Sequence, residues 1–180
     1  NPKLALPALC KIVKTGLSAT QKTAIDDRRT AVEEARRAER SAYEAGVAEK
    51  WDNALMTPAR MLSALSDALP ENAVVLDDSV SSKAALRHYI QGEKPGDLIG
   101  GRGGAIGWGI GATMGAQCAN LDRPVIGIMG DGSSMMTIQG LWTAANDNIP
   151  CVFVICNNGM YRVLKVNMDI YKKDILHEEE

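Results

Sequence analysis

Two short motifs in the second half of the chain carry side-chain oxygen atoms that suit a cation. The first is Gly-Asp-Gly, centred on Asp131, and the second is Asn-Asn-Gly, centred on Asn158. A carboxylate and an amide carbonyl are hard oxygen donors, which suit Mg²⁺ or Ca²⁺ and suit zinc poorly. The pair therefore predicts a site for a hard divalent cation, provided that the fold brings the two residues together.

The elements around these motifs predict that it does. One apolar run, Val125–Met129, ends at the first motif, and a second, Cys151–Cys156, ends at the other, with a helical segment at about Ser134–Asn146 between them. Two short apolar runs around one helix are typical of a βαβ unit, whose parallel strands end at the same edge of the sheet. Asp131 and Asn158 should then emerge side by side.

The glycines beside Asp131 add a second ligand class. Gly130 and Gly132 let the backbone approach a ligand closely, and the following helix presents its N–H groups and positive dipole end at the same place. A cation beside a helix N-terminus suits a diphosphate group. The alternative is that both motifs are ordinary turns, which these residue types dominate. The separation of the motifs, with strands on both sides, favours the diphosphate site.

The whole stretch GDGSSMMTIQGLWTAANDNIPCVFVICNNGMY resembles the metal–diphosphate motif of thiamine-diphosphate-dependent enzymes, most closely the benzoylformate decarboxylase and acetolactate synthase branch. The resemblance runs from about Thr57 to Tyr171. It implies Mg²⁺, with Ca²⁺ as a substitute, held by Asp131, Asn158 and the backbone carbonyl of Met160. It also implies a wider set of residues that bind thiamine diphosphate, namely Ser81, Gly104, Ile106, Gly130, Asp131, Gly132, Ser133, Asn158 and Met160.

Some of these positions keep a second interpretation. In the family a hydroxyl near Ser81 binds diphosphate, but serines before a helix are also typical N-caps. Val80 stands where several relatives place a further hydroxyl. By the resemblance, Gly104 offers its carbonyl to the aminopyrimidine ring and Ile106 supports the cofactor in a bent shape. Ordinary core packing is the alternative for Ile106.

The glycine-rich segment after Gly100 allows two other hypotheses. Gly107 begins a G-x-G-x-x-A pattern, but a dinucleotide motif should follow a strand directly, and this one lies within a helical pattern, Ile106–Ala119. Residues 103–121 carry no charge and are long enough to raise the question of a membrane span. Their many glycines, together with Gln117 and Asn120, favour a helix buried against a sheet.

Composition and charge limit the classes of function. The chain has 180 residues, 46% hydrophobic content, a net charge of −2 and a pI of about 5.8. This balance provides no electrostatic surface for nucleic acid or an anionic membrane. The four cysteines show no C-x-x-C spacing and lie in apolar stretches. They indicate reduced core residues of a cytoplasmic protein rather than zinc ligands or disulfides.

The first part of the chain differs in composition from the rest. Asn1-Pro2 and Gly16 mark the expected ends of a short helix, and Ala19–Asp52 predicts a long charged helix with an interruption at Gly46. In the resembling family such a segment follows the middle domain. Residues 1–54 are therefore expected to be the tail of a missing middle domain plus a charged linker helix. Residues 55–180 are expected to form the diphosphate- and Mg²⁺-binding domain, truncated.

For this domain the predicted fold class is α/β, with a mostly parallel sheet and helices on both faces. A helix over Thr57–Leu69 and a buried strand over Ala73–Leu76 are expected to open it. The resemblance implies the thiamine-diphosphate-binding fold, incomplete at the C-terminus.

The resemblance implies a carbon–carbon lyase that decarboxylates a 2-oxo acid or cleaves a 2-hydroxyacyl-CoA. It also implies a homo-oligomer, a dimer or tetramer, with the cofactor at a subunit interface. The family's activating glutamate lies on a separate pyrimidine-binding domain that has no counterpart here, so no catalytic residue is expected in this segment. A carboligase like acetolactate synthase and a non-catalytic phosphate- or metal-binding module are the alternatives.

Overall fold

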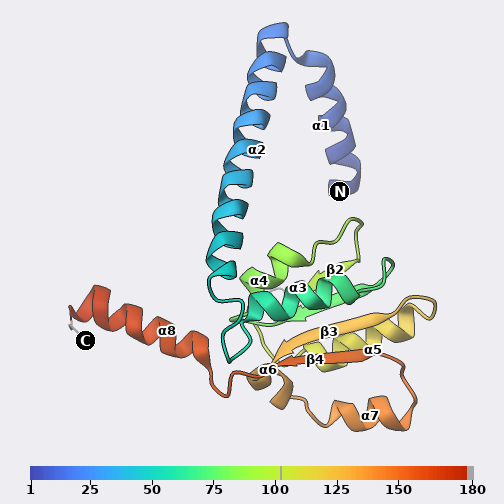
Figure 1. Cartoon of the computed structure of the whole chain (residues 1–180). Coiled ribbons are helices and arrows are strands. Elements are labelled where there is room, and N and C mark those ends of the chain that lie inside the picture. Colours follow the sequence, from blue (N-terminus) through green and yellow to red (C-terminus); the bar gives the residue numbers. More distant parts are fainter. Residues whose placement is uncertain (102, 178–180) are drawn as a thin grey trace. The chain divides into compact units, whose positions relative to one another are not determined.

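The two apolar runs that flank the cation motifs are neighbouring parallel strands in the computed structural model, which describes residues 1–101 and 103–177. Strand β3 spans Val125–Gly130 and β4 spans Val152–Cys156. With β1 (Val74–Asp78) and β2 (Leu98–Gly100) they form one sheet in the order β2-β1-β3-β4. All three strand pairs are parallel (Figure 1), so the predicted α/β class is confirmed.

The two inner strands form the centre of the core. Every residue of β1 is buried, as are the first five of β3. Val74, Leu76 and Val125 pack together and against Trp108, and Ala112 and Ala116 pack around the same cluster. Continuous apolar strands are expected where helices cover both faces of a sheet. Strand β4 is an edge strand, and Val152 and Ile155 are exposed.

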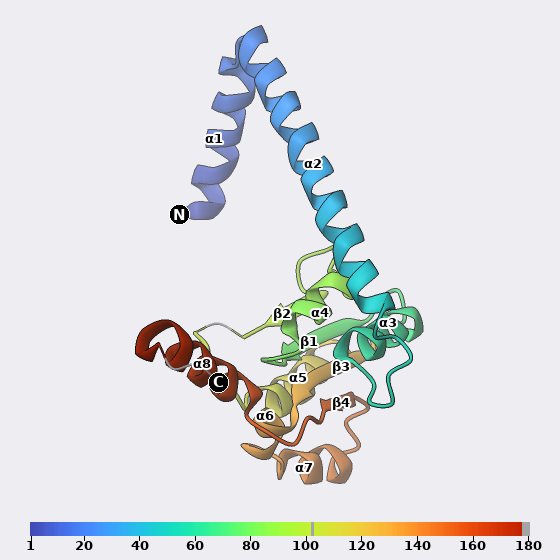
Figure 2. The same cartoon turned by 60° about the vertical axis from the view of Figure 1, so that its left-hand side comes forward.

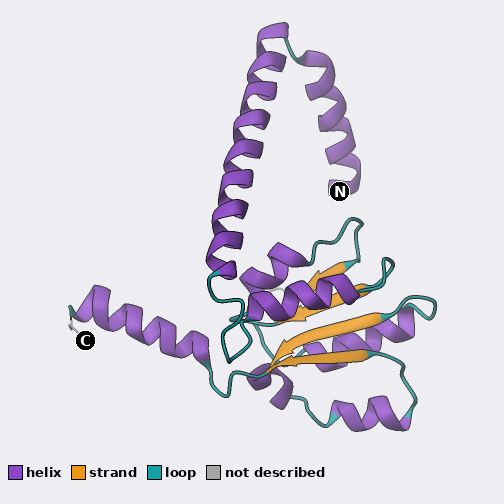
Figure 3. Cartoon of the chain, viewed as in Figure 1, coloured by secondary structure: helices purple, strands orange, loops and turns teal. Residues whose placement is uncertain are grey.

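Helices lie on both faces of the sheet. Helix α5 (Gly109–Ala119) packs on one face, where Thr113 lies so close to Gly127 that no Cβ would fit there. On the other face lie α3 (Pro58–Ala68) and α4 (Lys83–Tyr89), as Figures 1 and 3 show. The chain that links β3 to β4 contains α6 (Asp131–Met135) and α7 (Gly140–Asn146).

Helices α6 and α7 correct the prediction of a single helix over Ser134–Asn146. Helix α6 ends with Met136 as its C-cap residue. Directly after it, the Thr137 hydroxyl donates to the Gly107 carbonyl at 2.8 Å, which ties this segment to another loop. A Cβ on Gly140 would lie 2.7 Å from Cγ2 of Ile110, so the second helix begins at a close contact with α5. These contacts are distant in sequence and leave no local signal.

One strand and two other boundaries differ from the prediction. Strand β2 was not predicted at all. Helix α5 begins at Gly109 and not at Ile106, because Gly107 adopts a left-handed φ of 89° that a right-handed helix excludes. Strand β1 continues through Asp77 and Asp78, beyond the predicted end at Leu76.

Residues Asn1–Trp51 form a unit of their own, separate from Asp52–Glu180. The unit contains α1 (Pro2–Gly16), capped by Asn1, and α2 (Ala19–Ala48), which Ser18 and Gln21 begin with a capping box. The predicted interruption at Gly46 is wrong, since α2 runs through it. A glycine inside a helix costs only about 1 kcal/mol relative to alanine, which leaves a long helix intact.

The C-terminal part of the second unit is helical. Helix α8 (Arg162–Tyr171) continues into a short π-helical turn, Lys172–Leu176, and leads away from the sheet (Figure 2). Among the described residues, none of the helices combines the length and apolar character that a bilayer crossing requires. All four cysteines are free thiols, but Cys10 and Cys118 are exposed, which corrects the expectation that they are core residues.

Candidate functional site

The ends of β3 and β4 are joined by the aspartate of the first motif. Asp131 Oδ2 accepts a hydrogen bond from the backbone N–H of Gly159 at 2.9 Å. This contact follows from the parallel register, in which Gly130 is paired with Cys156. Asp131 and the Asn157–Gly159 loop therefore meet at the carboxyl edge of the sheet, where open parallel sheets bind their ligands.

Two contacts of the Asn158 side chain and one of Asn157 hold this loop at the same edge. The Asn158 Oδ1 accepts from the N–H of Met160 at 3.0 Å, and the Oδ1 of Asn157 accepts from the N–H of Gly159 at 3.0 Å. The Asn158 Nδ2 donates to the hydroxyl of Ser81 at 3.3 Å. The loops that follow β1, β3 and β4 are thus brought together, and Ser81 faces Asn158 across the edge.

The role of Ser81 as a simple N-cap is not supported. The N-cap position of helix α4 is Ser82 and not Ser81, and the Ser82 side chain makes no capping hydrogen bond. The exposed Ser81 hydroxyl is instead the acceptor for Asn158. The neighbouring Val80, where several relatives carry a hydroxyl, is also exposed. The absence of a hydroxyl at this position therefore leaves no buried hydrogen bond unmade.

The residues after Asp131 place backbone groups at the same edge. Helix α6 begins at Asp131, so the N–H groups of Gly132 and Ser133 lie in its first turn, where they lack partners within the helix. A Cβ on Gly132 would lie 2.6 Å from Cε1 of Tyr161, so a larger residue there would have to displace this exposed ring. Gly130 has open space around its Cα. Ser133 is buried, and the neighbouring Ser134 donates to the Asp131 carbonyl at 2.8 Å.

Gly104 and Ile106 lie in the loop between β2 and α5. Gly104 is exposed and adopts a left-handed φ of 75°. Ile106 is 40% exposed, so the interpretation as a core residue is wrong for the described chain. An isoleucine this exposed contributes little to the stability of the fold and is available to a ligand.

The donor set fits a hard cation. Within the described residues, three or more His, Cys, Asp or Glu side chains nowhere cluster as metal ligands. Zinc favours sulfur and imidazole, which neither Asp131 nor Asn158 offers. Asp131 offers a carboxylate, Asn158 an amide oxygen and Met160 a backbone carbonyl, and this mixture of oxygens is what Mg²⁺ and Ca²⁺ take.

Several residues around this edge received no functional role from the sequence, although Asp77, Asp78 and Ser79 were expected at the carboxyl end of the first strand. Asp77 Oδ1 accepts from the Ser79 hydroxyl at 2.7 Å, and its Oδ2 lies 4.0 Å from Nζ of Lys83. Burial raises the pKa of the Cys156 thiol, a hydrogen bond with Ser82 acts in the opposite direction, and the nearby carboxylates of Asp77 and Asp131 raise it further. Cys156 is therefore a neutral thiol rather than a nucleophile. Only the strand-end position of these residues could have signalled them.

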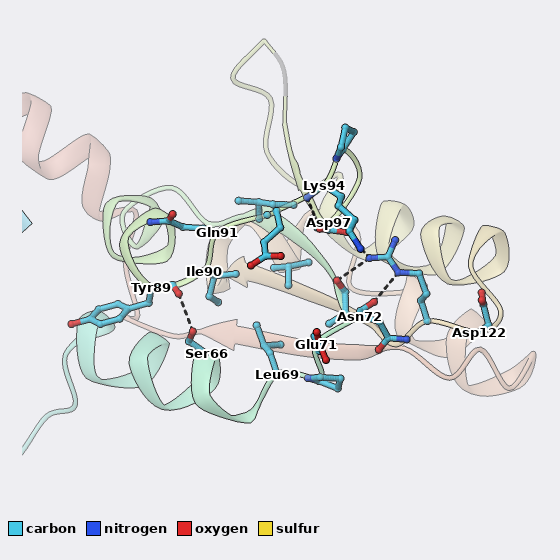
Figure 4. Close-up of a pocket in the computed structure, with 18 residues that line it drawn as sticks. Ser66, Leu69, Glu71, Asn72, Tyr89, Ile90, Gln91, Lys94, Asp97 and Asp122 are labelled. Carbon is cyan, nitrogen blue, oxygen red and sulfur yellow. Dashed lines mark hydrogen bonds and ion pairs between the residues drawn. The ribbon is translucent and has the colours of Figure 1, made fainter. Parts of the chain in front are cut away.

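A hollow of about 840 Å³ lies at the opposite, amino edge of the sheet (Figure 4). Several of its polar groups are engaged with one another. The Arg123 guanidinium donates to the carbonyls of Asn72 and Ala73 at 2.7 and 3.2 Å and to Asp97 Oδ1 at 2.7 Å. The Ser66 hydroxyl donates to the carbonyl of Tyr89 at 2.9 Å. This network braces the loops and leaves the carboxyl edge as the candidate site.

Comparison with known proteins agrees with this geometry. The family model "Thiamine pyrophosphate enzyme, C-terminal TPP binding domain" matches residues 78–179. Benzoylformate decarboxylase of Pseudomonas aeruginosa is 34% identical over 110 residues, which is 61% of this chain and 21% of the relative. The acetolactate synthase large subunit of Parasynechococcus marenigrum is 39% identical over 109 residues, 58% of this chain and 17% of the relative.

A solved structure gives the same result. The thiamine diphosphate-dependent 4-hydroxybenzoylformate decarboxylase of Rhodococcus jostii matches with a TM-score of 0.61 and 33% identity, over 69% of this chain and 23% of that protein. The chain spans about a fifth of the length of the curated relatives. The family match covers more than half of the chain and contains both cation motifs, so the chain belongs to the thiamine pyrophosphate enzymes, through their C-terminal TPP binding domain.

Proposed function

We propose that this chain is the diphosphate- and cation-binding part of a thiamine-diphosphate-dependent lyase. The substrate class is a 2-oxo acid, which is decarboxylated, or a 2-hydroxyacyl-CoA, which is cleaved. The observation that carries the proposal is the hydrogen bond from Gly159 to Asp131, which joins the two family motifs at one edge of the sheet. Identity to a benzoylformate decarboxylase supports the lyase assignment.

Each residue at this edge has a proposed task. Asp131, Asn158 and the carbonyl of Met160 hold Mg²⁺, and Ca²⁺ can replace it because both ions take oxygen donors. The diphosphate is bound by groups from three loops, namely Ser81, Gly130, Gly132 and Ser133. The Gly104 carbonyl would orient the aminopyrimidine ring, and Ile106 would support the cofactor in a bent shape. When bound, thiamine diphosphate supplies a nucleophilic carbon and accepts electrons as a carbon–carbon bond breaks.

The acid–base partner of the cofactor is proposed to come from further polypeptide. The aspartates at this edge are already engaged: Asp77 with Ser79, Asp78 with Gly107, and Asp131 with Gly159. Helix α8 supports a partner next to the site, because it begins two residues after Met160 and exposes apolar side chains. These include Leu164, Met168 and Ile170. We propose a homo-oligomer, a dimer or tetramer, with the cofactor at a subunit interface.

A carboligase is the second candidate. It is favoured by the 39% identity to an acetolactate synthase large subunit, which exceeds the identity to benzoylformate decarboxylase. The two reactions share the same cofactor site and differ in whether a proton or a second carbonyl compound reacts last. The substrate pocket decides between them.

The test is an assay of the full enzyme, which contains this chain together with the polypeptide that supplies the glutamate. Thiamine diphosphate and Mg²⁺ are added with pyruvate, benzoylformate or an acyl-CoA substrate, and both CO₂ release and ligated products are measured. Cofactor-dependent CO₂ release with an aldehyde product supports the decarboxylase, and an aldehyde with formyl-CoA and no CO₂ supports cleavage of a 2-hydroxyacyl-CoA. An acetohydroxy acid product supports the carboligase. Cofactor binding without turnover of any substrate would support a non-catalytic binding module. The isolated chain is expected to be inactive, because general acid–base catalysis requires the partner within hydrogen-bond reach.

A further inference from the structure

The loop that carries Gly104 and Ile106 is anchored by a buried carboxylate from another element. Asp78 is the last residue of β1 and is only 5% exposed. Its Oδ2 accepts two backbone hydrogen bonds, from the N–H groups of Gly107 and Gly109, each at 3.0 Å. One oxygen atom therefore fixes both the end of the loop and the first residue of α5.

Gly107 is also held from its carbonyl side. The Thr137 hydroxyl, which lies just after α6, donates to the Gly107 carbonyl at 2.8 Å. Gly107 has a left-handed φ of 89°, and a Cβ there would lie 2.5 Å from Cβ of Met136. The residue next to Ile106 is thus fixed between β1 and the segment that follows the Gly-Asp-Gly motif.

The approach of Asp78 to the loop is itself close. A Cβ on Gly109 would lie 2.8 Å from Cβ of Asp78 and 3.0 Å from its Oδ2. Glycine is required at that position so that the carboxylate can reach both N–H groups. Asp78, Thr137 and the two glycines between them form what we call the loop clamp.

We propose that Asp78 is a positioning residue that, with Thr137, sets the place of Ile106 relative to the diphosphate end of the site. This inference rests on the proposed function. The Asp78 carboxylate binds the backbone N–H groups of Gly107 and Gly109, so it acts on Ile106 through the backbone. Rates depend steeply on such placement, because a shift of about 1 Å costs on the order of 100-fold.

The test compares Asp78→Ala with Asp78→Asn in the full enzyme. Alanine leaves both N–H groups unpaired, whereas the asparagine Oδ1 can accept both at the place of Oδ2. We expect Asp78→Ala to lower kcat at least about 10-fold, with the affinities for thiamine diphosphate and Mg²⁺ little changed, and Asp78→Asn to restore kcat. Hydrogen–deuterium exchange of the peptide covering residues 103–110, measured without cofactor, should rise in Asp78→Ala and stay low in Asp78→Asn.

The outcomes separate this proposal from the proposed function. Normal kcat in Asp78→Ala, or an equal loss of kcat in Asp78→Asn, would overturn the positioning role while leaving the cofactor assignment intact. A wild-type enzyme without cofactor-dependent turnover would reject the proposed function and with it the positioning role, and the exchange measurement would still decide whether Asp78 holds the loop. If Asp78→Ala does not fold, Thr137→Val removes only the hydroxyl and Thr137→Ser keeps it. A fall in kcat in the first and not in the second supports the clamp, and equal kcat in both contradicts it.

Discussion

The two edges of the same sheet use polar residues in opposite ways. At the amino edge, Arg123 donates to two carbonyls and to Asp97, so charges and dipoles on neighbouring loops pair with one another. At the carboxyl edge, Asp131 and Asn158 bind only backbone N–H groups and the Ser81 hydroxyl, between glycines. No basic side chain pairs with Asp131 within the described residues, and its Oδ2 accepts only a backbone N–H there.

The contrast extends to the aspartates that anchor each edge. At the amino edge the backbone N–H of Lys94, followed by the Arg123 guanidinium, lowers the pKa of Asp97. At the carboxyl edge burial raises the pKa of Asp78, and the N–H groups of Gly109 and Gly107 only partly offset this effect. The surroundings of Asp97 therefore favour its charged form, whereas burial disfavours the charged form of Asp78, and perturbed carboxyls of the second kind are typical of functional sites.

The largest expected effect comes from removing the carboxylate at the carboxyl edge. Asp131→Ala should weaken Mg²⁺ binding by more than the roughly 10–100-fold that loss of an outer-shell partner costs, because a direct ligand disappears. Cofactor-dependent turnover should fall with it, and calorimetric titration of Mg²⁺ in the presence of thiamine diphosphate measures the change. The matched control is Asp122→Ala, an exposed aspartate at the amino edge. Equal Mg²⁺ affinity in both variants would contradict the difference between the edges.

Ile106 and Ile110 form a second matched pair. They have the same side chain and lie close in the sequence, but they differ in burial. Ile106 is 40% exposed and Ile110 is 1% exposed. Ile106→Ala should lower kcat while leaving the free energy of unfolding nearly unchanged. Ile110→Ala should lower the free energy of unfolding by about 2–5 kcal/mol, the usual cost of such a core truncation, with normal turnover per folded molecule. Denaturant unfolding measured beside kcat checks both, and a stability loss in Ile106→Ala equal to that in Ile110→Ala would return Ile106 to the core.

A structural amide at the amino edge should affect stability alone. Gln117 is buried, its Oε1 accepts from the N–H of Val125 at 3.1 Å, and its Nε2 donates to the carbonyls of Asn120 and Arg123. Gln117→Ala leaves the Val125 N–H buried and unpaired, which costs about 1–3 kcal/mol. The exposed Gln139→Ala is the control. A change in cofactor affinity in Gln117→Ala would show that the two edges are not independent.

The smallest expected effects are pH-dependent and of opposite sign. The lowered pKa of Asp97 stabilises the fold above its unfolded value of 3.8 and is lost as the pH falls through the folded pKa, so Asp97→Asn should be less stable than wild type at pH 7 and equal to it in acid. The raised pKa of Asp78 favours the fold below 3.8 and this advantage is lost as the pH rises through the folded pKa. Asp78→Asn should therefore gain stability at pH 7. Melting temperatures of each variant and of the wild type, measured between pH 3 and pH 7, check both expectations. The difference in melting temperature between variant and wild type should change with pH in opposite directions for the two variants, and a change in the same direction would contradict the contrast.

Much of this sheet could be predicted from the sequence, because β1, β3 and β4 are short apolar runs and the last two end at the Gly-Asp-Gly and Asn-Asn-Gly motifs. Because parallel strands end at the same edge of the sheet, Asp131 is expected beside Asn158 from the sequence alone. Strand β2 could not be predicted, since it has only three residues and is exposed at its end. The loop clamp was also beyond local patterns, because Asp78 and Gly107 are 29 residues apart. The sequence indicated the ligands, whereas the residues that hold their loops depend on tertiary contacts.

The most direct test is an experimental structure of the full enzyme with thiamine diphosphate, in which Mn²⁺ replaces Mg²⁺ and is located by anomalous scattering. The account predicts one ion at the carboxyl edge, with side-chain oxygens of both Asp131 and Asn158 at about 2.0–2.6 Å from it. It also predicts the diphosphate beside Gly132 and Ser133. An ion bound at the amino edge among Asp97 and Asp122, or Asp131 and Asn158 on separate ions, would contradict it.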